Sequence, residues 1–233
     1  MNDKNSVKRL HFDSLFSTQD YAKEKRSEGK DLVVTAACQT GGKGTKGRDF
    51  SSSIGGVYLS KLTFYENLPT KNAFQIMIGA AVSVCEVLRF YGVKPLIKWP
   101  NDIWVNDKKI CGILIENVFS GEKVRSSVVG IGLNVHNELP EELQVLATTM
   151  LLETGRKQDV EEVTAQLIGE LSKERTMDEY LSYIGYMDRD ATLLLGDERV
   201  SGRLLFVDEE GGLHVQIGKE HRRFTSAEVS VRL

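Results

Sequence analysis

The pattern of hydrophobic and polar positions predicts a mixed run of helices and strands over most of the chain. The stretch DLVVTAACQT, residues 31–40, is rich in β-branched residues and predicts a strand. The longest helix candidate is NAFQIMIGAAVSVCEVLRFYG, residues 72–92, which ends on a glycine. Between residues 95 and 119, PLIKWPNDIWVNDKKICGILIENVF predicts three strands separated by a Pro-Asn-Asp turn and an Asn-Asp turn.

Four shorter segments complete this region. Residues 17–29, STQDYAKEKRSEG, predict a helix with a Ser or Thr cap at its start and a glycine at its end. Residues 56–64 and 126–136 read as strands, and ENLPT, residues 66–70, is expected to turn the chain. From residue 140 to residue 186 the pattern becomes helical.

After residue 186 the pattern changes to short strands separated by glycine-containing turns. Five such strands in so short a length suggest a small SH3-like barrel. We therefore expect a domain covering residues 1–186 and a second covering 187–233. The first has hairpins rather than regular βαβ units, which predicts an α+β fold with a mixed sheet.

Composition excludes several classes of protein. A net charge of −3 and a pI of about 5.9 argue against a general nucleic-acid binder. The three cysteines, Cys38, Cys85 and Cys111, have no zinc-binding spacing and are expected to be reduced thiols in a cytosolic protein. The first residues contain no apolar signal segment, and charged residues interrupt the apolar run at 73–91, which favours a buried helix over a membrane span.

The loop CQTGGKGTKGRDF, residues 38–50, combines four glycines with three cationic side chains. Backbone N–H groups in such a loop form a concavity that binds anions. The loop fits neither GxxxxGK[ST] nor a GxGxxG turn between a strand and a helix, because a strand is expected to follow it. This mismatch argues against a dinucleotide-binding sheet, and an ordinary flexible surface loop is the alternative to an anion-binding loop.

Three other segments have residues suited to chemistry. In KWPND, residues 98–102, Asp102 could accept from an amine or hold a metal ion and Asn101 could contact phosphate, although Pro-Asn-Asp is also an ordinary turn. Lys109 precedes a strand and could stabilise developing negative charge, although surface lysines are far commoner. In GIGLN, residues 130–134, the glycines allow a close approach to Asn134, or form a kink in a sheet.

The order of these segments resembles that of the biotin protein ligases. That family has a Ser-Thr-Asn-like start, a Gln followed by GRGRxGRxW, then KWPND, a Lys before a GIL-E stretch, and GIGIN. The corresponding segments here are STQ, QTGGKGTKGRDF, KWPND, KKICGILIE and GIGLN. ATTMLLETG resembles the family's ATSL segment, and the tail resembles its SH3-like domain. The resemblance covers nearly the whole chain and implies the class II synthetase-like catalytic fold.

The resemblance implies an enzyme that forms biotinyl-5′-AMP from biotin and MgATP and then transfers biotin to a lysine of a biotin carboxyl carrier domain. By match to the family's motifs, the resemblance implies that Lys109, Asp102 and Arg48 are catalytic. It implies no metal ligand from the protein, since Mg²⁺ binds together with ATP. The implied biotin-binding residues are Ser17, Thr18, Gln19, Gln39, Gly42, Lys43, Gly44, Thr45, Lys109 and Gly112. The implied ATP- and phosphate-binding residues are Lys43, Arg48, Trp99, Asn101 and Asn134.

The chain departs from the family pattern in the glycine loop. Lys43 stands where the family has an Arg and lacks the two-pronged guanidinium, and Thr45 loses the charge of a second Arg. We hypothesise that this loop holds the adenylate less tightly, so that some escapes. Phe50 replaces the usual Trp, and Gln19 the usual Asn.

The resemblance also suggests partners and rivals. Only about sixteen residues precede Ser17, so we expect the monofunctional type, without a DNA-binding domain, in the cytoplasm and away from membranes. Family members form dimers through a sheet edge, and a homodimer is one assembly open to this chain. The rival functions are a lipoate or octanoate protein ligase and a non-catalytic biotin-binding regulator. A plain nucleotide-binding module does not explain Ser-Thr-Gln and Gln39.

Overall fold

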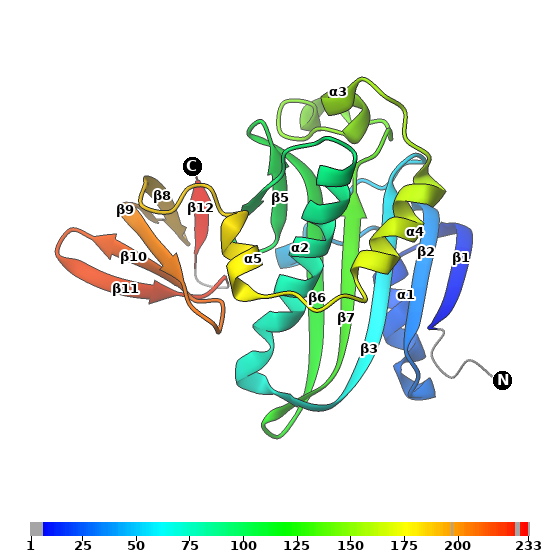
Figure 1. Ribbon diagram of the computed structural model, residues 1–233, viewed down its shortest axis with the longest axis horizontal. Coiled ribbons are helices and arrows are strands. Elements are labelled where there is room, and N and C mark those ends of the chain that lie inside the picture. The colour runs from blue at the N-terminus through cyan, green and yellow to red at the C-terminus, as the bar shows by residue number, and fades with distance from the viewer. Residues whose placement is uncertain (1–6, 197, 227–228, 233) are drawn as a thin grey trace.

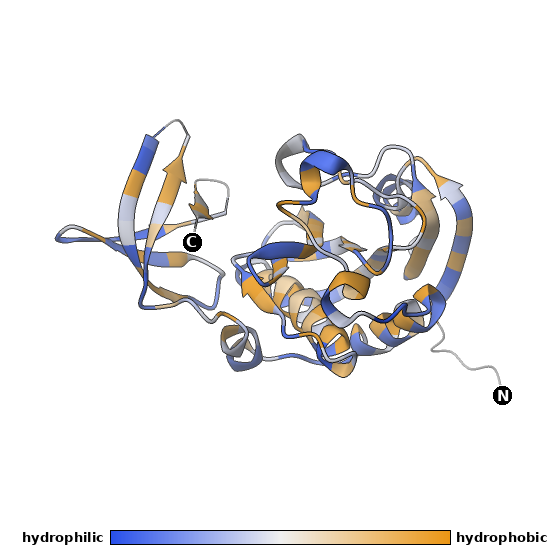
Figure 2. Cartoon of the chain, turned by 90° about the horizontal axis from the view of Figure 1, so that it is seen from above, coloured by the Kyte–Doolittle hydropathy of each residue, from blue (hydrophilic) through white to orange (hydrophobic). Residues whose placement is uncertain are grey.

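The computed structural model describes residues 7–196, 198–226 and 229–232. These residues form two sheets, and the smaller sheet stands to one side of the larger unit (Figures 1 and 2). The expected combination of an α+β mixed-sheet unit with a small C-terminal β unit is therefore confirmed. The boundary expected at residue 187 stays a prediction.

The larger sheet has seven strands in the order β1-β2-β3-β7-β6-β5-β4. Only β1 and β2 pair in parallel, and every other neighbouring pair is antiparallel. The strands are β1 (Lys8–Leu15), β2 (Leu32–Gln39), β3 (Val57–Pro69), β4 (Leu96–Lys98), β5 (Asp102–Val105), β6 (Lys108–Ser120) and β7 (Lys123–Leu133).

The parallel pair is an element that the sequence pattern did not predict. Strand β1 connects to β2 through helix α1 (Thr18–Glu24) and the 3₁₀ turn η1 (Lys25–Glu28), which makes one βαβ unit where only hairpins were expected. Strand β1 lies at the sheet edge and is mostly exposed, so it has no apolar run to reveal it. The caps of the helical segment are as predicted: the Ser17 side chain accepts from the N–H of Asp20, and Gly29 is left-handed.

The prediction that ENLPT turns the chain is wrong. Strand β3 continues to Pro69 through an irregularity in its pairing with β7 between Phe64 and Leu68. Pairing with the far end of β7 therefore overrides the local turn preference. The chain turns instead at the 3₁₀ segment η3 (Thr70–Asn72).

Helix α2 (Phe74–Phe90) packs on one face of the large sheet. The segment Thr70–Phe90 is long and apolar enough to cross a membrane, but 56% of an apolar 18-residue stretch within it is buried inside the fold, as in the core helix of a globular unit. Helix α1 covers the opposite face, because Leu32 and Val34 of β2 pack with Ala22 whereas Val33 joins the core under α2. The two faces are therefore distinct, and the candidate site lies on the α1 side.

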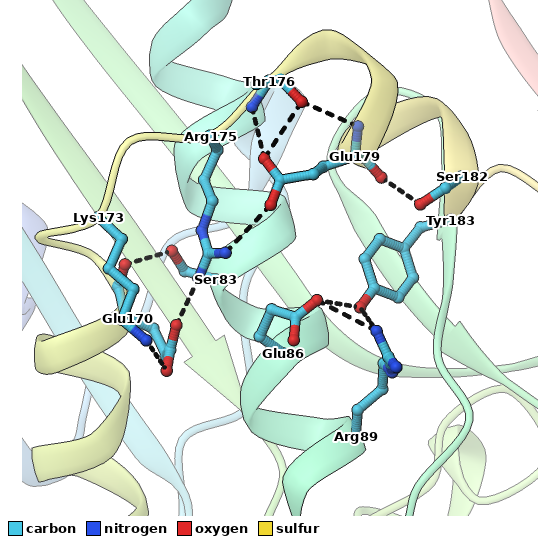
Figure 3. Close-up of polar contacts among 10 residues, drawn as sticks. All are labelled: Ser83, Glu86, Arg89, Glu170, Lys173, Arg175, Thr176, Glu179, Ser182 and Tyr183. Carbon is cyan, nitrogen blue, oxygen red and sulfur yellow. Dashed lines mark hydrogen bonds and ion pairs between the residues drawn. The ribbon is translucent and has the colours of Figure 1, made fainter.

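The helical region expected at residues 140–186 is confirmed only in part. It contains η4 (Glu141–Leu143), α3 (Met150–Thr154), α4 (Val160–Glu170) and α5 (Met177–Ser182), so residues 140–149 form a 3₁₀ turn and loop where helix was expected. Polar contacts hold the connection between α4 and α5 against α2 (Figure 3). There Arg175 pairs with Glu170 and Glu179, and Tyr183 donates to Glu86 over 2.5 Å.

The smaller sheet contains the five short strands that the sequence predicted, all antiparallel, in the order β11-β10-β9-β8-β12. The buried side chains of this sheet are apolar and belong to the main hydrophobic core. Along its strands, hydrophobic and hydrophilic residues are interspersed (Figure 2). The strands are β8 (Asp190–Leu195), β9 (Glu198–Val207), β10 (Leu213–Ile217), β11 (Glu220–Phe224) and β12 (Ser230–Arg232).

Candidate active site

A narrow cavity, here called the inner cavity, lies where the start of α1 meets β2, β3, β6 and β7 on the α1 face of the sheet. It encloses only about 40 Å³, the space of a few water molecules. Many of the residues that the sequence predicted line it. They are Ser17, Thr18, Gln19, Gln39, Lys43, Gly44, Thr45, Asn101, Lys109 and Gly112.

One wall of the inner cavity is a set of neutral polar groups that bond to one another. The backbone N–H and the hydroxyl of Thr18 both donate to Oε1 of Gln39, over 2.8 and 3.0 Å. The Gln39 amide nitrogen donates to Ser52 over 2.9 Å, and the Ser60 hydroxyl donates to the Thr18 hydroxyl over 2.9 Å. Because Thr18, Ser52 and Ser60 are buried, these bonds fix the orientation of each group before any ligand arrives.

Gln19 extends this wall toward the middle of the sheet. Its amide nitrogen donates to Glu116 over 2.8 Å, and its amide oxygen accepts from Ser60 over 3.2 Å. A Cβ at Gly130 would lie 2.5 Å from that oxygen, so glycine is needed to let Gln19 lie against β7. The GIGLN glycines thus allow a close approach, as predicted, here of a protein side chain.

Phe50 accounts for the small size of the inner cavity. A Cβ at Gly132 would lie 2.4 Å from the Phe50 ring, and one at Gly112 would lie 3.2 Å from it. The ring therefore rests directly on the two glycines of β6 and β7. A ligand larger than a few water molecules enters this space only if Phe50 and its loop move.

The glycine loop, residues 41–50, arches over the inner cavity and is called the lid below. Its backbone closes on itself, because Gly44 N–H donates to Arg48 and Phe50 N–H donates to Gly42. A Cβ at Gly42 would lie 2.5 Å from both the Phe50 carbonyl and the Ser52 hydroxyl, so this position requires glycine. The Arg48 guanidinium donates to the Thr45 hydroxyl over 3.1 Å. Thr45 therefore orients the side chain of Arg48, at a position where the family pattern has an arginine of its own.

On the far side of the lid lies a larger cavity of about 660 Å³, here called the outer cavity. Lys98 and Trp104 line it, together with six of the predicted site residues: Gly44, Thr45, Arg48, Asp102, Lys109 and Asn134. The Lys109 ammonium lies 2.7 Å from the Asp102 carboxylate, which makes an ion pair. Since Lys109 lines both cavities, this pair lies at the boundary between them.

The two predicted asparagines donate to backbone rather than into open space. Asn101 Nδ2 donates to the carbonyl of Ile113 over 2.9 Å, which ties the KWPND turn to β6. Asn134 Nδ2 donates to the carbonyl of Thr148 over 3.1 Å, and its side-chain oxygen accepts from Asn137. Both side chains therefore hold the loops that shape the cavities.

Trp99 points away from both of these cavities. The residue is 4% exposed, and its indole N–H donates to the carbonyl of Gly211 over 3.1 Å. Gly211 lies between β9 and β10, so Trp99 joins the KWPND turn to the smaller sheet. It also borders a third cavity of about 340 Å³ between the two sheets.

Several residues of the site were not predicted from the sequence. Ser60 is a buried polar residue between Tyr58 and Leu62 on one face of β3, and that interruption of an apolar face is a signal that could have identified it. Lys98 and Trp104 come from the neighbouring strands β4 and β5, and the Lys98 ammonium lies 3.8 Å above the indole ring. Glu116 and Asp20 gave no sequence signal, because they act through side chains that are distant along the chain.

A protein-built metal centre was not expected. Across residues 7–196, 198–226 and 229–232, no group of three or more His, Cys, Asp or Glu side chains is arranged to hold a metal ion.

Comparisons with known proteins agree with this geometry. Residues 12–134 match the model of the Biotin/lipoate A/B protein ligase family. The chain is 31% identical to the bifunctional ligase/repressor BirA of Bacillus subtilis, over 95% of this chain and 73% of that protein, and 29% identical to BirA of Escherichia coli, over 93% and 71%. It superimposes on the biotin protein ligase of Aquifex aeolicus in complex with biotin and ATP with a TM-score of 0.77 and 29% identity, covering 97% of this chain and 98% of that one. The chain therefore belongs to the biotin/lipoate A/B protein ligase family.

Proposed function

We propose that this protein is an ATP-dependent biotin protein ligase, which activates biotin as biotinyl-5′-AMP and transfers it to a lysine of a carrier protein. The observation that carries the proposal is the Lys109–Asp102 ion pair at the boundary between the inner and outer cavities. A cation and a base at one junction suit a two-step reaction in which negative charge develops first and a proton leaves second.

The two cavities suit the two substrates once Phe50 and the lid have moved away from Gly112 and Gly132. The wall formed by Thr18, Gln19, Gln39 and Ser60 offers fixed hydroxyl and amide groups, which match the neutral, polar ureido group of biotin. The outer cavity is large enough for a nucleotide and contains cationic groups that match phosphate. Biotin bound in the inner cavity would direct its carboxylate toward Lys109.

Mg²⁺ fits this site as a companion of ATP rather than as a resident ion. Mg²⁺ commonly keeps several water molecules and binds through substrate phosphates with few protein ligands. The described part of the chain has no acidic cluster that would hold it independently. Asp102 is the carboxylate of the outer cavity nearest to Lys109, and the ion would supply charge neutralisation at the phosphates.

In the first step, a carboxylate oxygen of biotin attacks the α-phosphorus of ATP. The new acyl–phosphate bond forms as the bond to the β-phosphate oxygen breaks, and pyrophosphate leaves. Negative charge builds on the α-phosphate oxygens, and Lys109 and Arg48 are the cations available to offset it. The lid excludes water, which would hydrolyse the mixed anhydride.

In the second step, the amine of the carrier lysine attacks the acyl carbon and AMP leaves, so that an amide bond forms. That amine is mostly protonated at neutral pH and must lose a proton. Asp102 accepts it, since Lys109 turns to the phosphate oxygens in the adenylate and releases the Asp102 carboxylate from the ion pair.

The rival functions fit the site less well. A lipoyl or octanoyl chain is apolar and would leave the hydrogen-bonding groups around Thr18 and Gln39 facing hydrocarbon. A non-catalytic biotin-binding regulator has no need of the intact Lys109–Asp102 pair. A biotin ligase accounts for both features.

The partners are part of the same proposal. We propose that the acceptor is a biotin carboxyl carrier domain and that the protein acts in the cytoplasm, without binding DNA or membrane. The net charge of −3 and the burial of the apolar helix α2 support this assignment. Strands β1 and β4 are the edges of the large sheet and offer backbone for a homodimer.

The deciding experiment is ATP-dependent transfer of labelled biotin to a biotin carboxyl carrier domain, with lipoate and octanoate tested in parallel. We expect transfer of biotin only, and a loss of about 100-fold or more in Lys109→Ala. Lys108→Ala is the matched control, because its ammonium donates to the exposed carbonyl of Gln144 outside the site. Transfer by Lys109→Ala within a few-fold of the unaltered protein would contradict the proposed role.

A further inference from the structure

We propose that Asp20 is a positioning residue for the lid, which it holds over the inner cavity through its ion pair with Lys43, and that this contact retains the adenylate. The inference rests on the proposed function. It gives Lys43 a partner in the protein, where the family resemblance assigned it to biotin and phosphate.

The ion pair joins Lys43, which lines the inner cavity, to the first turn of α1. The Lys43 ammonium lies 2.7 Å from the Asp20 carboxylate, with the two side chains 45% and 25% exposed. The backbone of Lys43 is held within the lid by a β-bridge to Asp49. Asp20 is fixed in the first turn of α1, because its N–H donates to the Ser17 hydroxyl over 3.2 Å. The pair thus ties the lid to an element of the rigid scaffold.

The same carboxylate is linked to the polar wall of the cavity. Asp20 also pairs with Lys23 over 3.0 Å, and Lys23 pairs with Glu116 over 3.1 Å. Glu116 accepts in turn from the amide of Gln19 over 2.8 Å. A continuous series of polar contacts therefore runs from the lid to a side chain that lines the inner cavity, and the closed lid and the position of Gln19 support each other.

The charge states agree with a true ion pair. Partial burial alone would raise the pKa of the Asp20 carboxyl, but hydrogen bonds and charges from Lys43 and Lys23 outweigh it, so the pKa lies below its usual value. Asp20 is therefore ionised throughout the neutral range.

Two observations favour a lid contact over a direct phosphate contact for Lys43. Its ammonium is already neutralised by Asp20 and lines the inner cavity rather than the outer one. Arg48 and Lys109 line the outer cavity, where they supply the cations for phosphate. A lysine ammonium is a point charge and lacks the two-pronged guanidinium of an arginine, so Lys43 neutralises either Asp20 or a phosphate, and not both at once.

The test compares Asp20→Asn, Lys43→Gln and the double variant with the unaltered protein. The readouts are pyrophosphate release, biotinyl-AMP released into solution, and the KM for biotin and kcat of transfer. An exposed ion pair changes an equilibrium by up to about fivefold, so we expect leakage and KM to rise by about two- to fivefold while kcat changes little. The double variant should match the single variants, and Asp20→Glu should restore retention.

A second readout needs no ligand. Arg48 is exposed in the lid, and trypsin cleavage after it reports how often the lid opens. We expect cleavage in Asp20→Asn to be about two- to fivefold faster. Glu28→Gln is the matched control, since it removes the exposed pair with Lys25 just beyond α1 and should change neither leakage nor cleavage.

The outcomes separate the two proposals. If the unaltered protein forms no biotinyl-AMP, the proposed function fails, and trypsin cleavage still decides the role of Asp20. If adenylate forms and Asp20→Asn neither leaks more nor is cut faster, the inference is overturned. It is also overturned if the effects of Asp20→Asn and Lys43→Gln add, because Lys43 would then act elsewhere.

Discussion

The two sheets place their polar side chains in opposite ways. In the seven-stranded sheet, Thr18, Gln19 and Ser60 are buried and bonded to one another around a cavity. In the five-stranded sheet the interior is hydrocarbon, and the bonded polar groups, such as Asp208 and Arg223, lie nearer the solvent.

This difference indicates where each sheet contributes to function. Buried polar groups are costly unless they are bonded, so a sheet that contains several of them around a cavity uses them for recognition. The smaller sheet has the arrangement of an ordinary stabilising unit. It contacts the site in two ways: Trp99 donates a hydrogen bond to Gly211, which supports the KWPND turn, and Val229 and Val231 line a cavity together with Arg48 and Asp102. Mutations in the large sheet should therefore change chemistry, and mutations in the small one should change stability.

Asp102→Asn should show the largest effect in the large sheet beyond Lys109. Asn preserves the shape next to Lys109 but cannot accept a proton, so the transfer step should slow by about 100-fold. Formation of the adenylate should fall much less, because its charge is offset by cations. The measurement supplies preformed biotinyl-AMP and carrier domain in a single turnover and compares it with the rate of pyrophosphate release.

Asp107→Asn is the control for that prediction. Asp107 lies in the neighbouring hairpin turn with a positive φ of 63°, a conformation that Asn also tolerates, and is exposed. It should leave both steps unchanged. Equal losses in the two steps of Asp102→Asn would mean that Asp102 only holds Lys109.

A glutamine from each sheet gives the second test of the comparison. Gln39→Ala leaves the N–H and hydroxyl of Thr18 without their acceptor, at a cost of about 1–3 kcal/mol, so the affinity for biotin should fall by about tenfold or more. Gln216→Ala removes a half-buried side chain of the small sheet that donates to the carbonyl of Gly218, and it should leave that affinity unchanged. Titration calorimetry measures the affinity of each variant for biotin. Equal affinities would contradict the assignment of biotin recognition to the large sheet.

Much of the fold could be predicted because its signals are local. The capped helix after Ser17, the apolar helix α2 and the hairpin at Asn106 each follow from a few neighbouring residues. The edge strand β1 and the extension of β3 to Pro69 were missed, because each depends on pairing with a strand far along the chain. Local pattern does not record such pairing.

The site shows the same division. The order of the motifs predicted Lys109, Asp102 and Gln39 as site residues, but it did not predict Asp20 or Ser60. Those side chains matter through contacts that the fold creates, such as the one between Asp20 and the lid. Trp99 belongs to the KWPND motif and yet donates its hydrogen bond to the smaller sheet. A sequence motif does not specify which part of the fold each of its side chains contacts.

The smallest expected effect concerns the smaller sheet and its response to acid. Burial would raise the pKa of Asp208, but hydrogen bonds from Arg223, His214 and the Gly212 N–H lower it far below its usual range. A carboxyl with a lowered pKa in the folded state contributes stability above its unfolded pKa of about 4, and that contribution disappears as the pH falls below this value. Asp208→Asn should therefore lower the free energy of unfolding by on the order of 1 kcal/mol at pH 7, and by less at pH 3. Urea unfolding at the two pH values measures the difference, while biotin transfer at pH 7 should be unchanged. A variant that unfolds normally but transfers biotin poorly would show that the smaller sheet takes part in the chemistry.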